Sequence, residues 1–346
     1  MELNPEGIRN ILKKVKYPGF SRDIVSFGIV KDIGVEGSKV TISLLIPKPD
    51  EKVESEIRES VRKTLLESPG VSDVDIRIGI RELKKAEASR RIQGPGIKYF
   101  IAVASGKGGV GKSTVAVNLA LAISQKRNNV GLLDADVWGP SIPIMMGLNE
   151  RPVATPEKKI IPLKKYGLKL MSIGFLIDED DTVIWRGPMV HGAVKQFVED
   201  VDWKGTDYLI VDLPPGTGDA QLSLIQTVPL SGSVIVTTPQ DVALIDVRRG
   251  VQMFRKLNVP VLGIVENMSY LVCPNCRGEV DIFSRGGGRR MSEKFNVPFL
   301  GEVPIDPEIR RGGDEGNPIV ISHPESPTAK AFMDIAERVL ESIEPR

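Results

Sequence analysis

The 346-residue chain has only two cysteines, no long apolar run and almost no net charge. Two cysteines are too few for the disulfide framework of a secreted domain. No apolar run approaches the ~20 residues that span a bilayer, and the start MELNPEGIRN has no basic region followed by an apolar core. A net charge of +1 gives no reason to expect nucleic acid or an anionic membrane as a partner. We therefore expect a cytoplasmic protein with neither partner.

The chain is long enough for more than one domain. Residues 1–82 predict a small α/β domain in the order α-β-β-α-β, with helices at 5–15 and 51–66 and strands at 24–30, 40–46 and 74–80. Residues 83–98 are charged and then contain glycine and proline, which is typical of a linker. Residues 99–346 form the second predicted domain.

The second domain contains short strands that are apolar on both faces. They are expected at residues 99–104, 130–133, 208–211, 234–237 and 261–265, with helix-length segments between several of them. Such strands indicate a parallel sheet that helices cover on both sides. The predicted fold is therefore α/β: a mostly parallel, doubly wound P-loop sheet preceded by a small α+β domain.

The strand at 99–104 leads into GKGGVGKST, which satisfies the P-loop pattern GxxxxGK[ST] and precedes a helical segment. A plain glycine-rich turn is the alternative, which this context disfavours. In a P-loop, backbone N–H groups and the helix dipole bind phosphate. Lys112 would contact the β- and γ-phosphates, and the Ser113 hydroxyl would coordinate Mg²⁺. The predicted nucleotide-binding residues are Gly106, Lys107, Gly108, Gly109, Val110, Gly111, Lys112, Ser113 and Thr114.

Acidic residues follow two of the predicted strands. Asp134 and Asp136 come after the strand at 130–133, and Asp212 ends the strand at 208–211. The carboxyl ends of parallel strands form the ligand-binding edge of a doubly wound sheet. An apolar strand ending in Asp is the Walker B arrangement, which predicts that Asp212 holds Mg²⁺ directly or through water. Asp134 and Asp136 could alternatively be solvated strand-end caps.

Cys273 and Cys276 have the spacing of a metal or redox pair. A closed zinc site or a cubane cluster needs about four ligands. The two histidines, His191 and His323, are far away in sequence, so a symmetric dimer would supply the missing pair. A dimer-bridging cluster, a dimer-bridging zinc and a redox pair all remain open at this point.

The motifs GKGGVGKST, DADVWGPSIP, DLPPGTGD, ENMS and CPNC occur in an order that resembles the Mrp/ApbC-type iron–sulfur cluster carriers. These carriers belong to the MinD/ParA-like class of P-loop ATPases, whose deviant Walker A motif has a second lysine. The resemblance covers almost the whole chain. It implies a slow, dimer-dependent ATP hydrolase in which Lys107 reaches the partner's nucleotide, Asp136 orients or activates the attacking water and Asp134 supports the Mg²⁺ shell.

The same resemblance extends to the base and to the cysteines. It implies that Asn267 hydrogen-bonds adenine and that a loop with Pro304 and Asp306 packs against the base, although all three could be ordinary turn residues. It also implies that Cys273 and Cys276 hold a [4Fe-4S] cluster across a homodimer. The cluster would come from scaffold donors and pass to apo-proteins.

Residues 1–82 resemble the small cluster-assembly domain of many such carriers, through YPGF at 17–20 and the segment 25–30. The domain lacks the cysteine or DPE triplet of related domains. It is therefore interpreted as a docking or regulatory module, or as a stabilising appendage.

A second function of another class is a MinD/ParA-like positioning ATPase with a zinc-bridged or metal-free dimer. A basic amphipathic tail would favour it, but the predicted last helix, 326–343, carries Glu337 and Glu341 against few bases. The segment Trp185-Arg186-Gly187-Pro188 has no assigned role, and could be a dimer contact or a turn.

Overall fold

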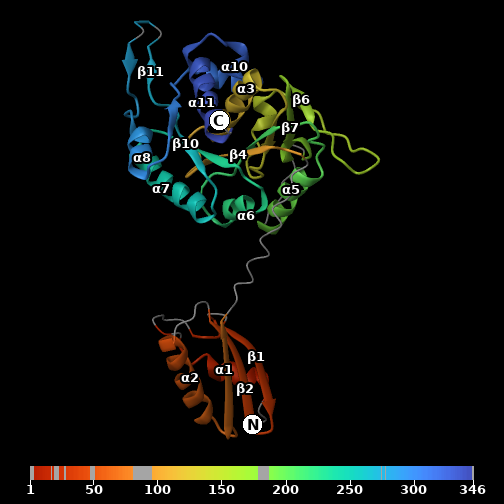
Figure 1. Cartoon of the computed structure of the whole chain (residues 1–346), viewed down its shortest axis with the longest axis vertical. Coiled ribbons are helices and arrows are strands. Elements are labelled where there is room, and N and C mark those ends of the chain that lie inside the picture. The colour runs from red at the N-terminus through yellow and green to blue at the C-terminus, as the bar shows by residue number, and fades with distance from the viewer. Residues whose placement is uncertain are drawn as a thin grey trace. The chain divides into compact units, whose positions relative to one another are not determined.

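A computed structural model describes residues 4–16, 18, 23–26, 29–46, 51–80, 96–177, 187–273, 275–276 and 278–344. The chain divides into two compact units, Met1–Ala88 and Ser89–Arg346 (Figure 1). The predicted linker at 83–98 falls largely on residues outside the described part. In the described ranges, no helix is both long and apolar enough to cross a membrane.

The smaller unit is a three-stranded sheet with two helices. Its elements are α1 (Pro5–Leu12), β1 (Val30–Glu36), β2 (Lys39–Ile46), α2 (Glu51–Leu66) and β3 (Asp73–Ile80). The central strand β2 pairs antiparallel with β1 and parallel with β3. Val40, Ile42 and Leu44 of β2 alternate with less buried residues and pack in one core with Ile57 and Val61 of α2.

The order α-β-β-α-β agrees with the sequence analysis, but the first strand was predicted in the wrong place. Ile24 to Ser26 form a turn, and β1 begins only at Val30. The Asp23 carboxylate accepts hydrogen bonds from the backbone N–H groups of Val25 and Ser26, at 3.0 and 2.8 Å, which stabilises the turn. The buried apolar residues Ile24 and Ile29 thus belong to a loop that packs on the core.

The larger unit is built on an eight-stranded sheet in the order β13-β10-β9-β4-β8-β5-β7-β6. All neighbouring pairs are parallel except β6 and β7. The α/β class with a mostly parallel sheet is therefore confirmed. The strands are β4 (Tyr99–Ser105), β5 (Val130–Asp134), β6 (Leu163–Lys165), β7 (Leu168–Ser172), β8 (Tyr208–Asp212), β9 (Gly232–Thr237), β10 (Val261–Glu266) and β13 (Phe299–Glu302).

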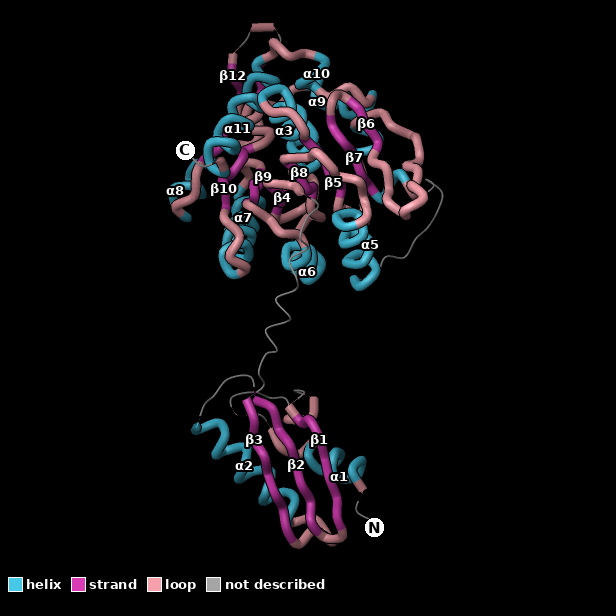
Figure 2. The backbone as a smooth tube through the Cα atoms, turned by 45° about the vertical axis from the view of Figure 1, so that its right-hand side comes forward, coloured by secondary structure: helices cyan, strands magenta, loops and turns pink. Residues whose placement is uncertain are grey.

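Helices cover both faces of this sheet (Figure 2). Those of one face, α3 and α11, share a core with Ile101 and Val103 of the central strand β4. Those of the other, α5, α6 and α7, share a core with Phe100 and Ala102, the alternate residues. The helices are α3 (Lys112–Lys126), α4 (Ile142–Met145), α5 (Gly187–Glu199), α6 (Asp219–Thr227), α7 (Asp241–Lys256), α8 (Gly287–Phe295), α9 (Pro307–Glu315), α10 (Ile319–Ser322) and α11 (Pro327–Ile343), with a 3₁₀ turn η1 at Ile173–Phe175.

A small hairpin follows β10 and carries the cysteines. Its strands are β11 (Leu271–Val272) and β12 (Glu279–Val280), which pair antiparallel. Leu271 also forms a parallel bridge with Ile305. The cysteine segment therefore lies between β10 and β13 in the chain. It follows the carboxyl end of β10, as the P-loop follows the carboxyl end of β4.

Candidate functional site

The loop after β4 winds tightly through its glycines. Gly109 and Gly111 have φ values of 80° and 79°, in the left-handed region. A Cβ added to Gly111 would lie 2.2 Å from Asn267 Nδ2, and one added to Gly106 would lie 2.2 Å from the Asp246 Cβ. The loop, with Asp136 and Pro215 nearby, encloses a cavity of about 300 Å³. Helix α3 begins at Lys112, so its N-terminus faces this cavity, as an anion site requires.

Lys112 is buried among the predicted acidic residues. Its Nζ donates to Asp212 Oδ1 at 2.6 Å, lies 3.6 Å from Asp136 Oδ2 and lies 3.2 Å from the Ser113 hydroxyl. Residues from α3, from the end of β8 and from the loop after β5 thus meet at one point. The ammonium group offsets the charge of carboxylates that would otherwise be buried without a partner.

Asp134 lies directly opposite Asp212 in the register of β5 and β8, and its side chain is fully buried. Its Oδ2 accepts a hydrogen bond from the Ser172 hydroxyl at 2.9 Å, and its Oδ1 accepts one from the Asp136 N–H at 3.1 Å. Burial, helped by the nearby Asp212 carboxylate, raises the pKa of Asp134 to about 8. Asp134 is therefore mainly protonated at neutral pH.

Asp136 lines the phosphate cavity and is less enclosed. Burial raises its pKa above the usual range, while the Lys112 ammonium opposes the shift. A carboxyl group with a raised pKa is better suited to accept a proton near neutral pH.

The second carboxylate oxygen of Asp212, the one that Lys112 does not contact, indicates a cation site. Its Oδ2 is buried, and among the described residues no donor reaches it. A buried carboxylate oxygen without a partner is costly, and Mg²⁺ prefers oxygen ligands of this kind. Asp212 and the Ser113 hydroxyl, on either side of Lys112, therefore fit a Mg²⁺ ion.

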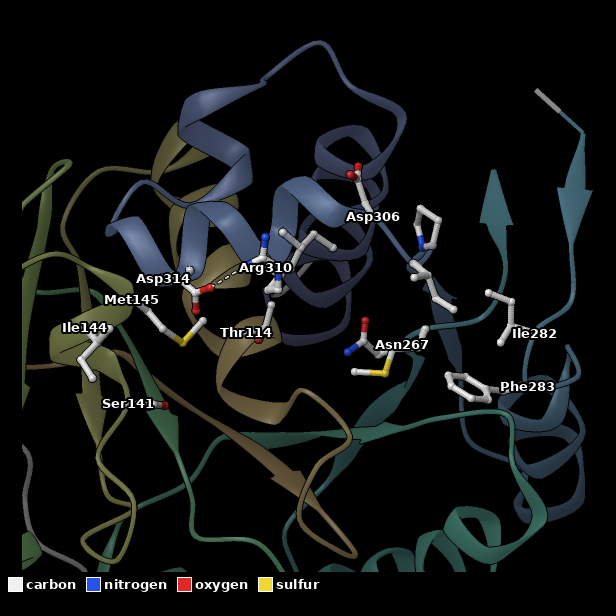
Figure 3. A pocket seen from close by; sticks show the side chains of 15 residues that line it. Thr114, Ser141, Ile144, Met145, Asn267, Ile282, Phe283, Asp306, Arg310 and Asp314 are labelled. Atoms are coloured by element: carbon white, nitrogen blue, oxygen red, sulfur yellow. Dashed lines mark hydrogen bonds and ion pairs between the residues drawn. The ribbon is translucent and has the colours of Figure 1, made fainter. Parts of the chain in front are cut away.

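A second cavity of about 640 Å³ adjoins the first and shares Thr114, Ser141 and Met145 with it. Figure 3 shows side chains from α3, α4, α9 and the end of β10 around it. Apolar side chains form most of its wall and polar side chains stand among them, which is typical of a site for a small organic ligand such as a base and ribose. The lining residues are Thr114, Ser141, Ile144, Met145, Asn267, Met268, Ile282, Phe283, Pro304, Ile305, Asp306, Ile309, Arg310, Gly313 and Asp314.

Asn267, Pro304 and Asp306, the three predicted base-contacting residues, all line this cavity. Asn267 and Asp306 also make hydrogen bonds within the protein. Asn267 Nδ2 donates to the Val110 carbonyl at 2.8 Å, so this side chain also holds the P-loop. The Asp306 carboxylate caps α9 by accepting from the Glu308 N–H at 2.9 Å, and accepts from the Thr328 hydroxyl at 2.7 Å. Pro304 forms part of the wall.

Several lining residues were missed by the sequence analysis. Ile282 and Phe283 follow the cysteine hairpin, and Arg310 pairs with Asp314 on α9 at 2.9 Å. Ser172, at the end of β7, was missed in the same way. None of them belongs to a motif, and only their position after a strand or on a helix face could have indicated them.

Lys107 lines the phosphate cavity, and its carbonyl accepts a hydrogen bond from the Ser105 hydroxyl. Of the segment without an assigned role, Trp185 and Arg186 lie outside the described residues, while Gly187 and Pro188 begin α5.

Cys273 and Cys276 lie at the tip of the hairpin, where Cys273 is half-buried and Cys276 is exposed. The Cys273 N–H donates to the Gly278 carbonyl at 2.9 Å, closing the turn. The backbone N–H groups of Cys276 and Asn275 lower the pKa of the Cys273 thiol, which favours the thiolate. Across the described residues, no three His, Cys, Asp or Glu side chains are grouped as a metal site would require. Each chain thus offers two thiols and an incomplete ligand set.

Two family models match this chain. Residues 96–340 match the model described as "NUBPL iron-transfer P-loop NTPase", and residues 5–78 match that described as "Iron-sulfur cluster assembly protein". The chain is 44% identical to the "Iron-sulfur cluster carrier protein" of Synechocystis sp., over 97% of each chain. It is 53% identical to the "Iron-sulfur cluster transfer protein NUBPL" of Dictyostelium discoideum, over 72% of this chain and 78% of the relative.

Solved structures show the same fold. The nucleotide-binding protein in complex with ADP from Archaeoglobus fulgidus has a TM-score of 0.60 at 38% identity, covering 68% of this chain and 92% of that one. The cell division ATPase MinD of Pyrococcus furiosus has a TM-score of 0.54 at 24% identity, covering 71% and 99%. The second likeness concerns the fold alone.

Proposed function

The chain belongs to the family of NUBPL-type iron-transfer P-loop NTPases, as its resemblance predicts, and from this premise we propose that it is an ATP-hydrolysing iron–sulfur cluster carrier. Two copies would hold one [4Fe-4S] cluster between them, receive it from a scaffold donor and deliver it to an apo-protein. The observation that carries the proposal is the placement of the only two cysteines on a hairpin whose following residues, Ile282 and Phe283, line the cavity next to the P-loop.

The nucleotide-binding part of the proposal follows from the two adjoining cavities. The loop glycines and Lys112 would bind the phosphates, and the apolar cavity beside Asn267 and Pro304 would bind the base. Ser113 and Asp212 would hold Mg²⁺, supported by Asp134. When bound, that ion would neutralise charge on the β- and γ-phosphates.

The hydrolytic part depends on three side chains. Asp136 would orient the attacking water and accept its proton, for which its raised pKa is suited. Lys112 would leave its carboxylate partners to neutralise charge on the transferred phosphate. Lys107, which lines the cavity, would reach the nucleotide of the second copy. Hydrolysis would then change how the two copies meet.

The cluster is the cargo in this proposal. Two thiols per chain supply half of the four ligands that a cubane needs, and a symmetric pair of chains completes the set. The lowered pKa of Cys273 favours the thiolate that binds iron. The exposed Cys276 and the half-buried Cys273 are consistent with release to another protein.

The test is anaerobic reconstitution with iron and sulfide, followed by measurement of iron, zinc and sulfide per chain and of the visible spectrum. About two iron and two sulfide per chain, with a broad absorption band, are expected for one cluster per dimer. Cys273→Ala/Cys276→Ala should lose both metal and colour, whereas Asn275→Ala, on the same turn, should keep them. Zinc without sulfide, or no metal, would overturn the carrier function and leave a positioning ATPase as the better description.

A further inference from the structure

Arg285 is one of the side chains that attach the cysteine hairpin to the rest of the larger unit. Arg285 forms an ion pair with Glu279, the first residue of β12, and donates from Nε to Glu302 of β13 at 2.9 Å. Its guanidinium carbon lies 4.0 Å from the centre of the Tyr270 ring, and Tyr270 directly precedes β11. The start of one hairpin strand and the start of the other therefore contact the same side chain.

The hairpin needs such an anchor because it is small. Each strand has two residues, and Val272 and Val280 are 38% and 48% exposed, so little apolar surface is buried within it. Short hairpins are marginal on their own in water. The second attachment is the hydrogen bond from the Ile305 N–H to the Tyr270 carbonyl, 2.6 Å long. An exposed ion pair usually contributes little, but Arg285 joins two carboxylates and stacks on an aromatic ring.

The position of Arg285 is itself set by a buried carboxylate at the end of β10. Glu266 is fully buried, and its Oε1 accepts from the Ser269 hydroxyl at 2.6 Å and from the Gly286 N–H at 2.9 Å. Its Oε2 accepts from the Gly288 N–H. Three donors on one buried carboxylate fix the start of α8 firmly. Arg285 directly precedes Gly286, the N-cap residue of α8.

Asn267, the residue that follows Glu266 at the end of β10, contacts the P-loop. Asn267 donates to the Val110 carbonyl, and its Nδ2 lies where a side chain on Gly111 would have to be. A continuous path of hydrogen bonds and chain neighbours thus runs from the P-loop through Asn267, Glu266 and Gly286 to Arg285, and from there to Glu279 on the hairpin. Such networks can carry coupling between two sites when both bias the same element.

We propose that Arg285 is a positioning residue that holds the Cys273–Cys276 hairpin at a fixed orientation to the nucleotide cavity, so that a bound nucleotide changes the exposure of both thiols. The link between this coupling and cluster transfer rests on the proposed function. The test of the coupling does not, because thiol labelling is measured on the chain without iron. A nucleotide that engages the P-loop and Asn267 restrains the end of β10 and hence α8. The hairpin, tied to the start of α8, becomes less mobile.

The test is the labelling rate of the metal-free, reduced, full-length chain by a thiol-specific disulfide reagent at fixed pH. The chain has only two cysteines, so the rate reports on the hairpin alone. Saturating Mg–ADP, chosen because it lacks the γ-phosphate, should slow wild-type labelling roughly threefold. Arg285→Gln should label roughly threefold faster than wild type without nucleotide and lose the response to ADP. Arg285→Lys, which keeps the charge, should regain part of that response.

Arg290→Gln is the matched control, since Arg290 is exposed and stands on α8. Among the described residues, the hydrogen bond of its side chain is a long one to the Arg285 backbone carbonyl, at 3.3 Å. It should respond to ADP as wild type does. If Arg285→Gln does not fold, Glu279→Gln removes the other half of the ion pair and decides the question.

An equal ADP response in Arg285→Gln and Arg290→Gln, or no response in wild type, would overturn the positioning role. Failure of the cluster to assemble on wild type, with the ADP response intact, would overturn the carrier function and leave the positioning role standing.

Discussion

At the scale of single residues, the buried acids of the site are partly neutralised by Lys112 and by protonation. Lys112 lies within 4 Å of two carboxylates, and burial keeps the third acid, Asp134, protonated at neutral pH. One ammonium and one proton thus face three carboxyl groups, which leaves one net negative charge. A cation beside Asp212 would be attracted by it and would favour ionisation of Asp134.

The raised pKa of Asp134 predicts an unusual dependence of stability on pH. Its folded pKa of about 8 lies above its unfolded value of 3.8, so the folded state holds an extra proton between these pH values. The contribution of Asp134 to the free energy of unfolding is therefore fully present below pH 3.8. It falls as the pH rises toward 8, by at most about 1.4 kcal/mol per pH unit.

Asp134→Asn should flatten this slope. Urea unfolding with a chelator present, at pH 5.5 to 8.5, checks it through tryptophan fluorescence, since all three tryptophans lie in Ser89–Arg346. Equal slopes for wild type and variant would contradict the prediction.

Alanine substitutions at two glycines of the P-loop, Gly111 and Gly108, are predicted to have different effects on stability. Gly111→Ala would place a side chain at φ 79° and against Asn267 Nδ2, so it should destabilise the larger unit by about 2 kcal/mol and weaken nucleotide binding at least tenfold. A Cβ on Gly108 meets nothing within 4 Å, so Gly108→Ala should stay within about 0.5 kcal/mol of wild type. Thermal melts and calorimetric titration with ADP measure both effects.

At the scale of elements, α9, which lines the proposed base cavity, and α11 both begin with a proline and a capping side chain. Asp306 caps α9, and Ser326 caps α11 by accepting from the Ala329 N–H at 3.0 Å. Asp306 also accepts from Thr328 in the first turn of α11, so it joins the two helices. The wall of the base cavity is thereby fixed by helix capping.

Asp306→Ala tests whether this residue acts through the helix or through the base. Loss of the cap and of the Thr328 bond should cost about 1–2 kcal/mol of stability, with ADP affinity within about threefold of wild type. Asp314→Ala, at the other end of α9 with an exposed ion pair, should cost less than about 0.5 kcal/mol. A large loss of ADP affinity at unchanged stability would instead assign Asp306 to base recognition.

At the scale of the whole molecule, every residue assigned to the proposed chemistry lies in the unit Ser89–Arg346. This unit holds the two cavities and both cysteines, and it would supply half of the ligands of the proposed cluster. The proposed working molecule is therefore a pair of chains, and the smaller unit stands outside the chemistry as a module.

Lys107 provides the test of this pairing. A non-hydrolysable ATP analogue with Mg²⁺ should convert the full-length chain into a dimer in sedimentation velocity, and ADP should not. Lys107→Ala should weaken the analogue-induced dimer at least tenfold, about 1.4 kcal/mol, through loss of its contact with the partner's phosphates. Lys98→Ala removes an exposed lysine paired with Asp207 and should leave the dimer unchanged. Dimers of equal strength in both variants would rule out a role for Lys107 across the interface.

Much of the larger fold was predictable because its central strands are apolar on both faces. Strands β4, β5, β8, β9 and β10 lie within two residues of their predicted positions. The short strands β6, β7 and β13 were not predicted, since three to five residues with lysines or glycine carry too weak a pattern. In the smaller unit, the Asp23 turn outweighed the apolar residues that suggested a strand.

The site divides along a similar line. The P-loop, the strand-end acids and the cysteine pair carry motifs, and the structure brings the first two groups together at Lys112. Ser172, Phe283 and Arg285 carry no motif, because their partners are distant in sequence and meet them only in the folded chain. The roles of all these side chains stay predictions until the experiments above are done.

The large sheet ends in short strands at both edges. Strand β13 has four residues, and β6 has three, two of which are Lys164 and Lys165. An open edge is a template for runaway strand pairing and fibre growth, which brevity and lysine side chains oppose. The sheet edges therefore discourage aggregation in a protein that exposes Val280, Ile282 and Phe283 beside its cysteine hairpin.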